Sequence, residues 1–323
     1  MSLTVNGITI PENVANALYH NGVNITQVIY NGNIVWNQLL GPTMGLFYGG
    51  SINIGTYLNQ VTRIDANGSQ VGSETAIGTA RYAVAGATVG SNGLFYAGYI
   101  GTYLNKVTRI DANGSLVGSE TAIGTGRYDL VGATVGSNGL FYGGAIGSST
   151  YTNTVTRIDV NGSLVGSETA VGTVRFGAGG ATVGSNGLFY AGYAVTNKVT
   201  RIDANGALVG SETAVGTARY GAVGATVGSN GLFYAGYIGS SSYSNTVTRI
   251  DANGALVGSE TAVGTARGYA GGATVGSNGL FYGGAIGIGS YINKVTRIDA
   301  NGALVGSETA IGTARYGVAG ASL

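Results

Sequence analysis

Three short motifs recur six times along most of the chain, and their regular return limits the fold more than any other feature of the sequence. Successive copies of GLFY begin 44 to 48 residues apart. That period is typical of β-propeller blades, each made of four strands. GLFY begins at Gly45, Gly93, Gly139, Gly187, Gly231 and Gly279, VTRID contains Arg63, Arg109, Arg157, Arg201, Arg249 and Arg297, and GTxR ends at Arg81, Arg127, Arg175, Arg219, Arg267 and Arg315.

The length of the repeat varies in one place only. From each VTRID arginine to the glycine of the next GLFY there are always 30 residues, whereas from that glycine to the next VTRID arginine there are 18, 16, 18, 14, 18 and 18. Side chains alternate between the two faces of a strand, so changes in steps of two keep the flanking strands in register. The variation therefore indicates one variable hairpin loop in each repeat.

Each repeat reads as four short antiparallel strands. Asn92-Gly93 separates the first and second strands, and Asn113-Gly114 separates the third and fourth. Because Asn-Gly favours type I′ turns, we expect both dipeptides to form tight hairpin turns of that type. In the second copy the expected strands cover residues 83–90, 94–99, 106–111 and 116–123.

The two ends of the repeat region complement each other. Arg315 to Leu323 is a first strand with no second strand after it, and Met44 to Tyr48 is a second strand with no first strand before it. We therefore expect an all-β fold, a six-bladed β-propeller in which the C-terminal strand completes the first blade and leaves no open sheet edge.

Composition argues against several classes of function. Charged residues make up 9% of the chain, and fifteen basic groups nearly cancel fourteen acidic ones, so we expect no nucleic-acid partner. There is no cysteine, no long apolar run and no secretory signal, so we expect no disulfide and no membrane insertion. We expect synthesis in a cytoplasm and no cofactor.

The repeat R-x-x-x-x-G-A-T-V-x-x-N-G-L-F-Y-x-G, followed by a loop and N-x-V-T-R-I-D, resembles the kelch repeat. Gly49-Gly50, Gly143-Gly144 and Gly283-Gly284 match the paired glycines of that family, while three copies have Ala-Gly and none has the fourth-strand tryptophan typical of kelch. The resemblance covers about 280 residues. It implies a propeller, and since kelch propellers include both binding proteins and enzymes, it leaves the function open.

The first 40 residues share none of the repeat motifs. Asn24 to Trp36 reads as a hairpin around Asn31-Gly32, and its Y-N-G-x-x-V-W pattern resembles a short element near the ends of many bacteriophage tail and virion proteins. We therefore expect residues 1–40 to form an attachment segment, with Tyr30 and Trp36 as contact residues, and residues 41–323 to form the propeller. The alternative is a small hairpin that plugs one face of the propeller.

The residues needed for catalysis are scarce. His20 is the only histidine, and the repeated Asp and Glu occupy six equivalent settings, which suits structure better than acid–base chemistry. We expect these charges to brace the blades, with Arg63 forming a salt bridge to Glu74 across the outer hairpin. Calcium needs six to eight oxygen ligands, and Asp65-Ala66-Asn67-Gly68 offers too few, so we expect no metal. We predict a protein that is not an enzyme.

One face of the expected propeller differs from copy to copy. It carries the loops between the second and third strands and the junctions between each fourth strand and the next first strand; we call it the variable face. Tyrosine, serine and glycine concentrate there, as in antibody paratopes. The alternative is that the tyrosines simply pack between blades. We expect ligand contacts from Tyr57, Tyr103, Tyr128, Asp129, Tyr151, Tyr243, Tyr269 and Tyr291.

The sequence thus favours a bacteriophage virion component, such as a tail-fibre or baseplate accessory protein. Residues 1–40 would dock to other virion proteins, and the variable face would bind a host-surface glycan or protein. Three alternatives remain: a bacterial lectin-like or interaction propeller without a virion role, an enzyme with its site at the channel mouth, and a synthetic consensus propeller. A glycosidase would need a second carboxylate there, since Asp129 is the only one outside the repeats on that face.

Overall fold

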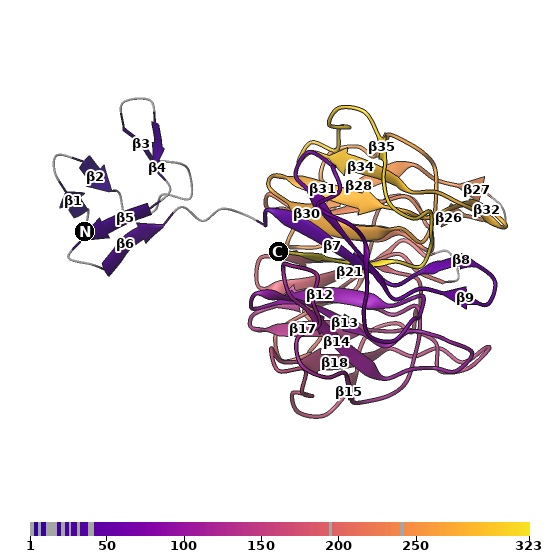
Figure 1. Ribbon diagram of the computed structural model, residues 1–323. Coiled ribbons are helices and arrows are strands. Elements are labelled where there is room, and N and C mark those ends of the chain that lie inside the picture. Colours follow the sequence, from indigo (N-terminus) through magenta and orange to yellow (C-terminus); the bar gives the residue numbers. More distant parts are fainter. Residues whose placement is uncertain are drawn as a thin grey trace. The chain divides into compact units, whose positions relative to one another are not determined.

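The computed structural model describes residues 42–193, 196–239 and 242–323 in full, and the backbone of six short strands within residues 3–37. All regular elements in these residues are β-strands, as expected (Figure 1). In the described residues no helix could cross a membrane. The chain divides into two compact units, residues 1–41 and 42–323.

The described strands of the first unit form three antiparallel pairs. The pair β5 and β6 coincides with the hairpin expected over residues 24–36, with Tyr30 opposite Asn33. The side chains of Tyr30 and Trp36, and the turn at residues 31–32, lie outside the described residues. The pairs are β1 (Leu3–Val5) with β2 (Ile8–Ile10), β3 (Leu18–His20) with β4 (Val23–Ile25), and β5 (Gln27–Tyr30) with β6 (Asn33–Asn37).

The second unit is a six-bladed β-propeller of four-stranded antiparallel sheets. Each blade runs from an inner strand at the axis to a two-residue outer strand. From inside outward the blades are β36 (Ala319–Ser322), β7 (Met44–Tyr48), β10 (Gln60–Asp65), β11 (Thr75–Ala76); β12 (Ala85–Val89), β13 (Asn92–Tyr96), β14 (Lys106–Ile110), β15 (Thr121–Ala122); β16 (Val131–Val135), β17 (Asn138–Tyr142), β18 (Thr154–Ile158), β19 (Thr169–Ala170); β20 (Gly179–Val183), β21 (Asn186–Tyr190), β22 (Lys198–Ile202), β23 (Thr213–Ala214); β24 (Val223–Val227), β25 (Asn230–Tyr234), β28 (Thr246–Ile250), β29 (Thr261–Ala262); and β30 (Gly271–Val275), β31 (Asn278–Tyr282), β34 (Lys294–Ile298), β35 (Thr309–Ala310).

Three of the variable loops form short hairpins of their own. They are β8 (Ser51–Asn53) with β9 (Thr56–Tyr57), β26 (Tyr237–Ile238) with β27 (Ser242–Tyr243), and β32 (Ala285–Gly287) with β33 (Ser290–Tyr291).

The ring closes through the C-terminal strand, which confirms the expectation from the sequence. β36 pairs with β7, with Ala319 opposite Tyr48. A belt of hydroxyl groups joins neighbouring inner strands: the Thr88 hydroxyl donates to the Ser322 carbonyl at 2.9 Å and accepts from the Ser322 N–H at 2.8 Å. The other members of this belt are Thr134, Thr182, Thr226 and Thr274.

The inner strands approach so closely that one position in each blade has no room for a side chain. A Cβ atom on Gly132 would lie 2.3 Å from the Gly86 carbonyl oxygen, and one on Gly86 would lie 2.3 Å from that of Gly320. Real Cβ contacts are never this short, so the ring requires glycine at this position in every blade. The remaining members of this glycine ring are Gly180, Gly224 and Gly272.

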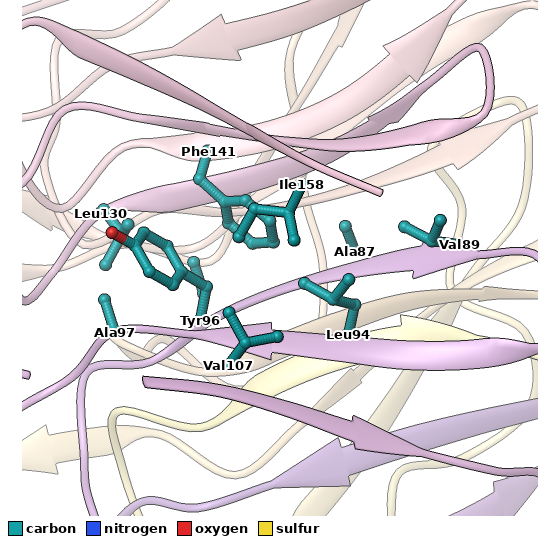
Figure 2. Close-up of a cluster of buried hydrophobic side chains, with 10 residues drawn as sticks. Ala87, Val89, Leu94, Tyr96, Ala97, Val107, Leu130, Phe141 and Ile158 are labelled. Carbon is teal, nitrogen blue, oxygen red and sulfur yellow. The ribbon is translucent and has the colours of Figure 1, made fainter. Parts of the chain in front are cut away.

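The hydrophobic core lies between neighbouring blades. Figure 2 shows one such cluster, in which Tyr96 of β13 meets Phe141 of β17 and Ile158 of β18. The two rings are 5.3 Å apart and tilted by 60°. All three side chains are fully buried, and each blade repeats the arrangement, so the core consists of six nearly equal layers.

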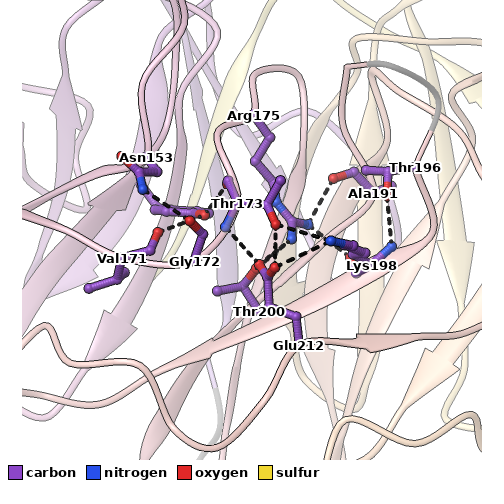
Figure 3. A network of polar contacts seen from close by, with 11 residues as sticks. Asn153, Val171, Gly172, Thr173, Arg175, Ala191, Thr196, Lys198, Thr200 and Glu212 are labelled. Carbon is purple, nitrogen blue, oxygen red and sulfur yellow. Dashed lines mark hydrogen bonds and ion pairs between the residues drawn. The ribbon is translucent and has the colours of Figure 1, made fainter.

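A buried arginine at each junction joins one blade to the next, and Figure 3 shows one of them, Arg175. Arg175 follows the outer strand of one blade and donates to Ala191 O, Lys198 O and the Thr200 hydroxyl of the next. Its ion pair with Glu212 measures 2.8 Å, and its guanidinium lies 6.0 Å from the centre of the Tyr142 ring in the preceding blade. The six GTxR arginines are at most 2% exposed, so their charges serve the scaffold.

The glutamates of this network depend on their threonine partners. Burial alone would raise the pKa of Glu212, but hydrogen bonds from Thr173 and Thr200 and the charge of Arg175 outweigh it and lower that pKa to about 2. Glu212 thus stays ionised in the folded protein and keeps the buried Arg175 charge compensated.

The predicted salt bridge from Arg63 to Glu74 is wrong. In the outer hairpin Val61 lies opposite Thr75, which places Thr62 opposite Glu74 and puts Arg63 on the other face. The Thr62 hydroxyl donates to Glu74, whose ion pair is with Arg315 at 3.5 Å. The charges brace the blades as expected, but through the GTxR arginines.

The turn assignments also need correction. Val89 pairs with Asn92, so the inner hairpin turns at Gly90-Ser91. Only Gly90 has a positive φ, 61°, as a type II′ turn requires at its first central residue. In the outer hairpin, Gly114 N donates to Asp111 O and Gly114 has φ of 80°, which is a type I turn with a bulge. Neither Asn-Gly pair forms a type I′ turn.

We predict that Gly132→Ala disrupts the ring, because its Cβ would overlap the backbone of the neighbouring blade. The loss should be about 3 kcal/mol or more, or roughly 10 °C in the thermal midpoint for a chain of this size. Gly287→Ala is the control, since its Cβ would meet only Ser290 at 3.6 Å. Equal midpoints for both variants, measured by circular dichroism, would contradict the close approach at the axis.

Candidate functional site

The junction residues fasten the variable loops to the scaffold. Tyr82, directly after the buried Arg81, exchanges two backbone hydrogen bonds with Tyr99 in the loop of the next blade, at 3.3 and 3.0 Å. Tyr220 and Tyr237 are joined in the same way at 3.1 and 2.7 Å. Each loop on the variable face is thereby held at its base by the segment that carries the arginine brace.

Thirteen tyrosines gather on the variable face, and each of them touches at least one other aromatic ring. We call them the tyrosine layer. They form three groups: Tyr57, Tyr82, Tyr99, Tyr103, Tyr128, Tyr291 and Tyr316; Tyr151 and Tyr193, joined by Phe176; and Tyr220, Tyr237, Tyr243 and Tyr269.

Within this layer, a loop tyrosine commonly stacks on the aromatic residue of the following junction. Tyr103 lies 5.6 Å from Tyr128 with the ring planes 16° apart, and Tyr291 lies 4.4 Å from Tyr316 at 19°. Such stacking fixes the rings before any ligand arrives. The structure thus places the predicted site tyrosines on one face, in three groups. They also pack between blades, so the two readings of the sequence are compatible.

The rings of the tyrosine layer keep part of their surface in solvent. Twelve of them are half-buried, and Tyr193 is 47% exposed. Around them the loops present isoleucines, of which Ile54 and Ile288 are fully exposed. The face therefore combines fixed aromatic area with an apolar rim, which is the composition of a binding surface.

A ring of six backbone hydrogen bonds surrounds the mouth of the central channel on this face. Each residue donates its N–H to the carbonyl of its counterpart in the preceding blade: Asp129 N to Ala83 O at 3.0 Å, and Gly317 N to Tyr269 O at 2.9 Å. Gly177 and Gly221 complete the ring, which we call the mouth ring. All six have a positive φ, from 54° at Asp129 to 66° at Gly221.

Three members of the mouth ring are not glycine, although a positive φ strains any residue with a side chain. Ala83, Asp129 and Tyr269 have φ of 55°, 54° and 57°. At Tyr269 the order of two residues is reversed. Its copy reads Gly268-Tyr269, whereas three other copies have an aromatic residue followed by glycine at these positions. The side chains of Asp129 and Tyr269 therefore lie at the mouth, whereas the other four members of the ring are alanine or glycine.

Asp129 lies in this mouth. No hydrogen bond or ion pair to its carboxylate occurs in the part of the chain that the structure describes. The Asp129 residue is half-buried among protein atoms and also lines a cavity at the mouth. This desolvation raises the pKa of Asp129 to about 7.

Three aromatic residues beside Asp129 were absent from the predicted site. Tyr82, Phe176 and Tyr316 line the same cavity, which has a volume of about 250 Å³. The signal that could have found them is their position: each directly follows the GTxR arginine, as Tyr128 does. In the sequence these junction residues look like part of the repeat, so only the loop tyrosines stand out.

The other predicted tyrosines belong to the tyrosine layer but do not line this cavity: Tyr57, Tyr103, Tyr151, Tyr243 and Tyr291. Within the described residues no cluster of three or more His, Asp or Glu could hold a metal ion. The chain matches none of the protein-family models and none of the curated proteins with which it was compared.

We predict that Asp129→Asn stabilises the protein at pH 8 and much less at pH 4. A carboxyl group whose pKa is raised in the folded state destabilises the fold when it ionises. The free energy of unfolding therefore falls as the pH rises from the pKa of the unfolded chain, near 4, to that of the folded protein, about 7. The full shift corresponds to about 4 kcal/mol, and partial exposure reduces the expected gain to about 2 kcal/mol. Urea unfolding at both pH values measures it, and an equal effect at pH 4 and pH 8 would contradict the burial of this charge.

Proposed function

We propose that the protein is a non-enzymatic binding protein, a component of a bacteriophage virion whose variable face binds a host-surface glycan or protein. The observation that carries the binding role is the contrast between scaffold and face. The repeated Arg, Glu, Thr and Asn side chains form contacts between and within blades. Asn153, for example, donates to Gly172 O at 3.0 Å. The tyrosine layer varies from blade to blade and stays partly exposed.

The physical character of the face supports recognition more than catalysis. Rings that are stacked before binding lose little conformational freedom when a ligand covers them. Sugars and proteins both use such aromatic surface. The one unpaired carboxylate at the mouth, Asp129, has no second carboxylate beside it in the described residues, whereas glycosidases generally use two.

The proposed virion role draws on the N-terminal unit. Its β5 and β6 strands carry the Y-N-G-x-x-V-W pattern that resembles an element of phage tail and virion proteins. We propose that residues 1–40 dock to other virion proteins, with Tyr30 and Trp36 in contact, and that the blades are kelch-like. The same propeller without this docking would be a bacterial lectin-like protein, so the two candidates separate at this unit.

Replacing two stacked loop tyrosines should abolish most of the binding. For Tyr103→Ala combined with Tyr291→Ala we expect a loss of host-cell or glycan binding of much more than tenfold, since each hot-spot aromatic is worth about 2 kcal/mol. The rings lie on loops, so circular dichroism should still show the folded propeller.

The matched control lies on the opposite face. Ser91 is exposed in the turn Gly90-Ser91, and Ser91→Ala should bind as well as the parent protein. Loss of binding in this control, with folding preserved, would argue against the variable face. Unchanged binding of the double tyrosine variant would do the same.

Removing residues 1–41 should separate attachment from folding. Because these residues form a compact unit of their own, we expect the remaining chain from Pro42 to unfold at an unchanged temperature. It should fail to enter virions assembled from the genome that encodes it, as measured by immunoblotting purified particles. Normal incorporation of the truncated chain would refute the attachment role.

A further inference from the structure

The cavity at the channel mouth combines one carboxylate with several aromatic walls. Asp129 contributes the only charged side chain among the residues that line it, and Tyr82, Tyr128, Phe176, Tyr269 and Tyr316 contribute rings. Its volume of about 250 Å³ suits a small organic group. The floor is the mouth ring, whose backbone N–H and C=O groups are already paired with each other. The polar recognition this cavity offers therefore comes from Asp129 and the phenols.

Among the described residues no basic side chain pairs with Asp129. All fifteen basic residues belong to the repeats. The GTxR arginines are buried against threonine and main-chain oxygens, and the three lysines, Lys106, Lys198 and Lys294, lie within 3.4–3.8 Å of glutamates. The VTRID arginines serve the opposite face, as where Arg109 donates to Val160 O at 3.3 Å. A positive charge that pairs with this carboxylate would therefore come from a ligand.

The surroundings favour an organic cation over a metal ion. A calcium ion would require six to eight oxygen ligands, and the described part of the mouth supplies one carboxylate. Aromatic faces, by contrast, attract ammonium groups, and the attraction is strongest where water is excluded. Tyr128 and Tyr269 have raised pKa values because of burial and because Asp129 lies near them, so these phenols stay neutral beside the charge.

In the mouth ring, Asp129 and Tyr269 occupy positions whose backbone conformation favours glycine. Asp129 and Tyr269 are the second and fifth of six members, so they face each other across the axis. Both hold a left-handed backbone that glycine adopts without strain at Gly177, Gly221 and Gly317. Strain kept at one end of a channel is a reason to look for function there.

We propose that the channel mouth binds an alkylammonium group, with its charge on Asp129 and its carbon atoms against the surrounding rings. This rests on the proposed binding role of the variable face and narrows it to one ligand chemistry. The group could belong to a quaternary head group or to a primary amine, as in an amino sugar or a lysine side chain.

Two pairs of probes of equal shape test the charge. Choline is compared with 3,3-dimethylbutan-1-ol, and n-butylammonium with 1-butanol, by calorimetry on the full chain at pH 8. We expect the cation of at least one pair to bind more than tenfold tighter than its neutral partner, and Asp129→Asn to remove that preference. The preferred cation identifies the source: choline for a quaternary head group, n-butylammonium for a primary amine. Asp111→Asn, in an exposed turn of the opposite face, should bind like the parent.

The pH profile gives a second readout. Choline has no titrating charge between pH 5 and pH 8, and the phenols facing Asp129, those of Tyr82, Tyr128, Tyr220 and Tyr269, remain neutral there. Choline affinity in the parent protein should therefore fall as the pH is lowered through about 7, where Asp129 gains its proton, and Asp129→Asn should show no such profile. If n-butylammonium is the preferred cation, it should give the same profile.

Several results would overturn the inference. They are equal affinity for cation and neutral partner, no binding of either cation, or a preference that survives Asp129→Asn. Glucose binding that is unaffected by Asp129→Asn, with neither cation preferred, would assign the mouth to neutral sugars. Host-cell binding that still depends on Tyr103 and Tyr291 would then leave the proposed function standing while this inference fails.

Discussion

The close approach of the inner strands at the axis governs the rest of the propeller. At the glycine ring, a carbonyl oxygen of each inner strand occupies the place where its neighbour's side chain would be, 2.2–2.4 Å from an ideal Cβ. Six blades can meet at this distance only if all six have glycine there. The hydroxyl belt on one side and the mouth ring on the other then pair the remaining polar groups of adjacent strands. Both require residues near the C-terminus, Ser322 in the hydroxyl belt and Gly317 in the mouth ring. Ring closure and packing at the axis therefore depend on each other.

Buried arginines are tolerated farther out because most of their hydrogen bonds are met. A guanidinium without water is costly unless its hydrogen bonds are met. Arg127 donates to the carbonyls of Gly143 and Thr154 and lies 5.8 Å from the centre of the Tyr96 ring, and its ion pair with Glu168 measures 3.5 Å. Its Nε atom has no partner among the described residues, so the site is not fully satisfied. Each such residue contacts two blades, and we infer that it sets the angle between them.

Much of the fold could be predicted because it depends on period and alternation. The six blades, the closing strand and the position of the variable loops follow from motif spacing alone. The turns could not be predicted, because Gly90-Ser91 and Asn92-Gly93 are both good turn sequences and only the pairing of Val89 with Asn92 decides between them. The ion-pair partner of Glu74 was predicted wrongly for a related reason. Ile64 bridges Gln70 while Val61 pairs with Thr75, so the outer segment contains two extra residues that the sequence does not mark.

The candidate site was predictable only in part, because it consists of departures from the repeat. The loop tyrosines stood out by composition, and Asp129 by being the one carboxylate outside the motifs on that face. The junction aromatics did not, since Tyr82 and Tyr316 look like part of the repeat until the mouth ring brings them around Asp129. In a sixfold scaffold with closely similar inner strands, a ligand on the axis would meet six nearly equal walls. A binding site with direction therefore requires that symmetry be broken at the mouth, and the exchange of order at Gly268-Tyr269, opposite Asp129, breaks it.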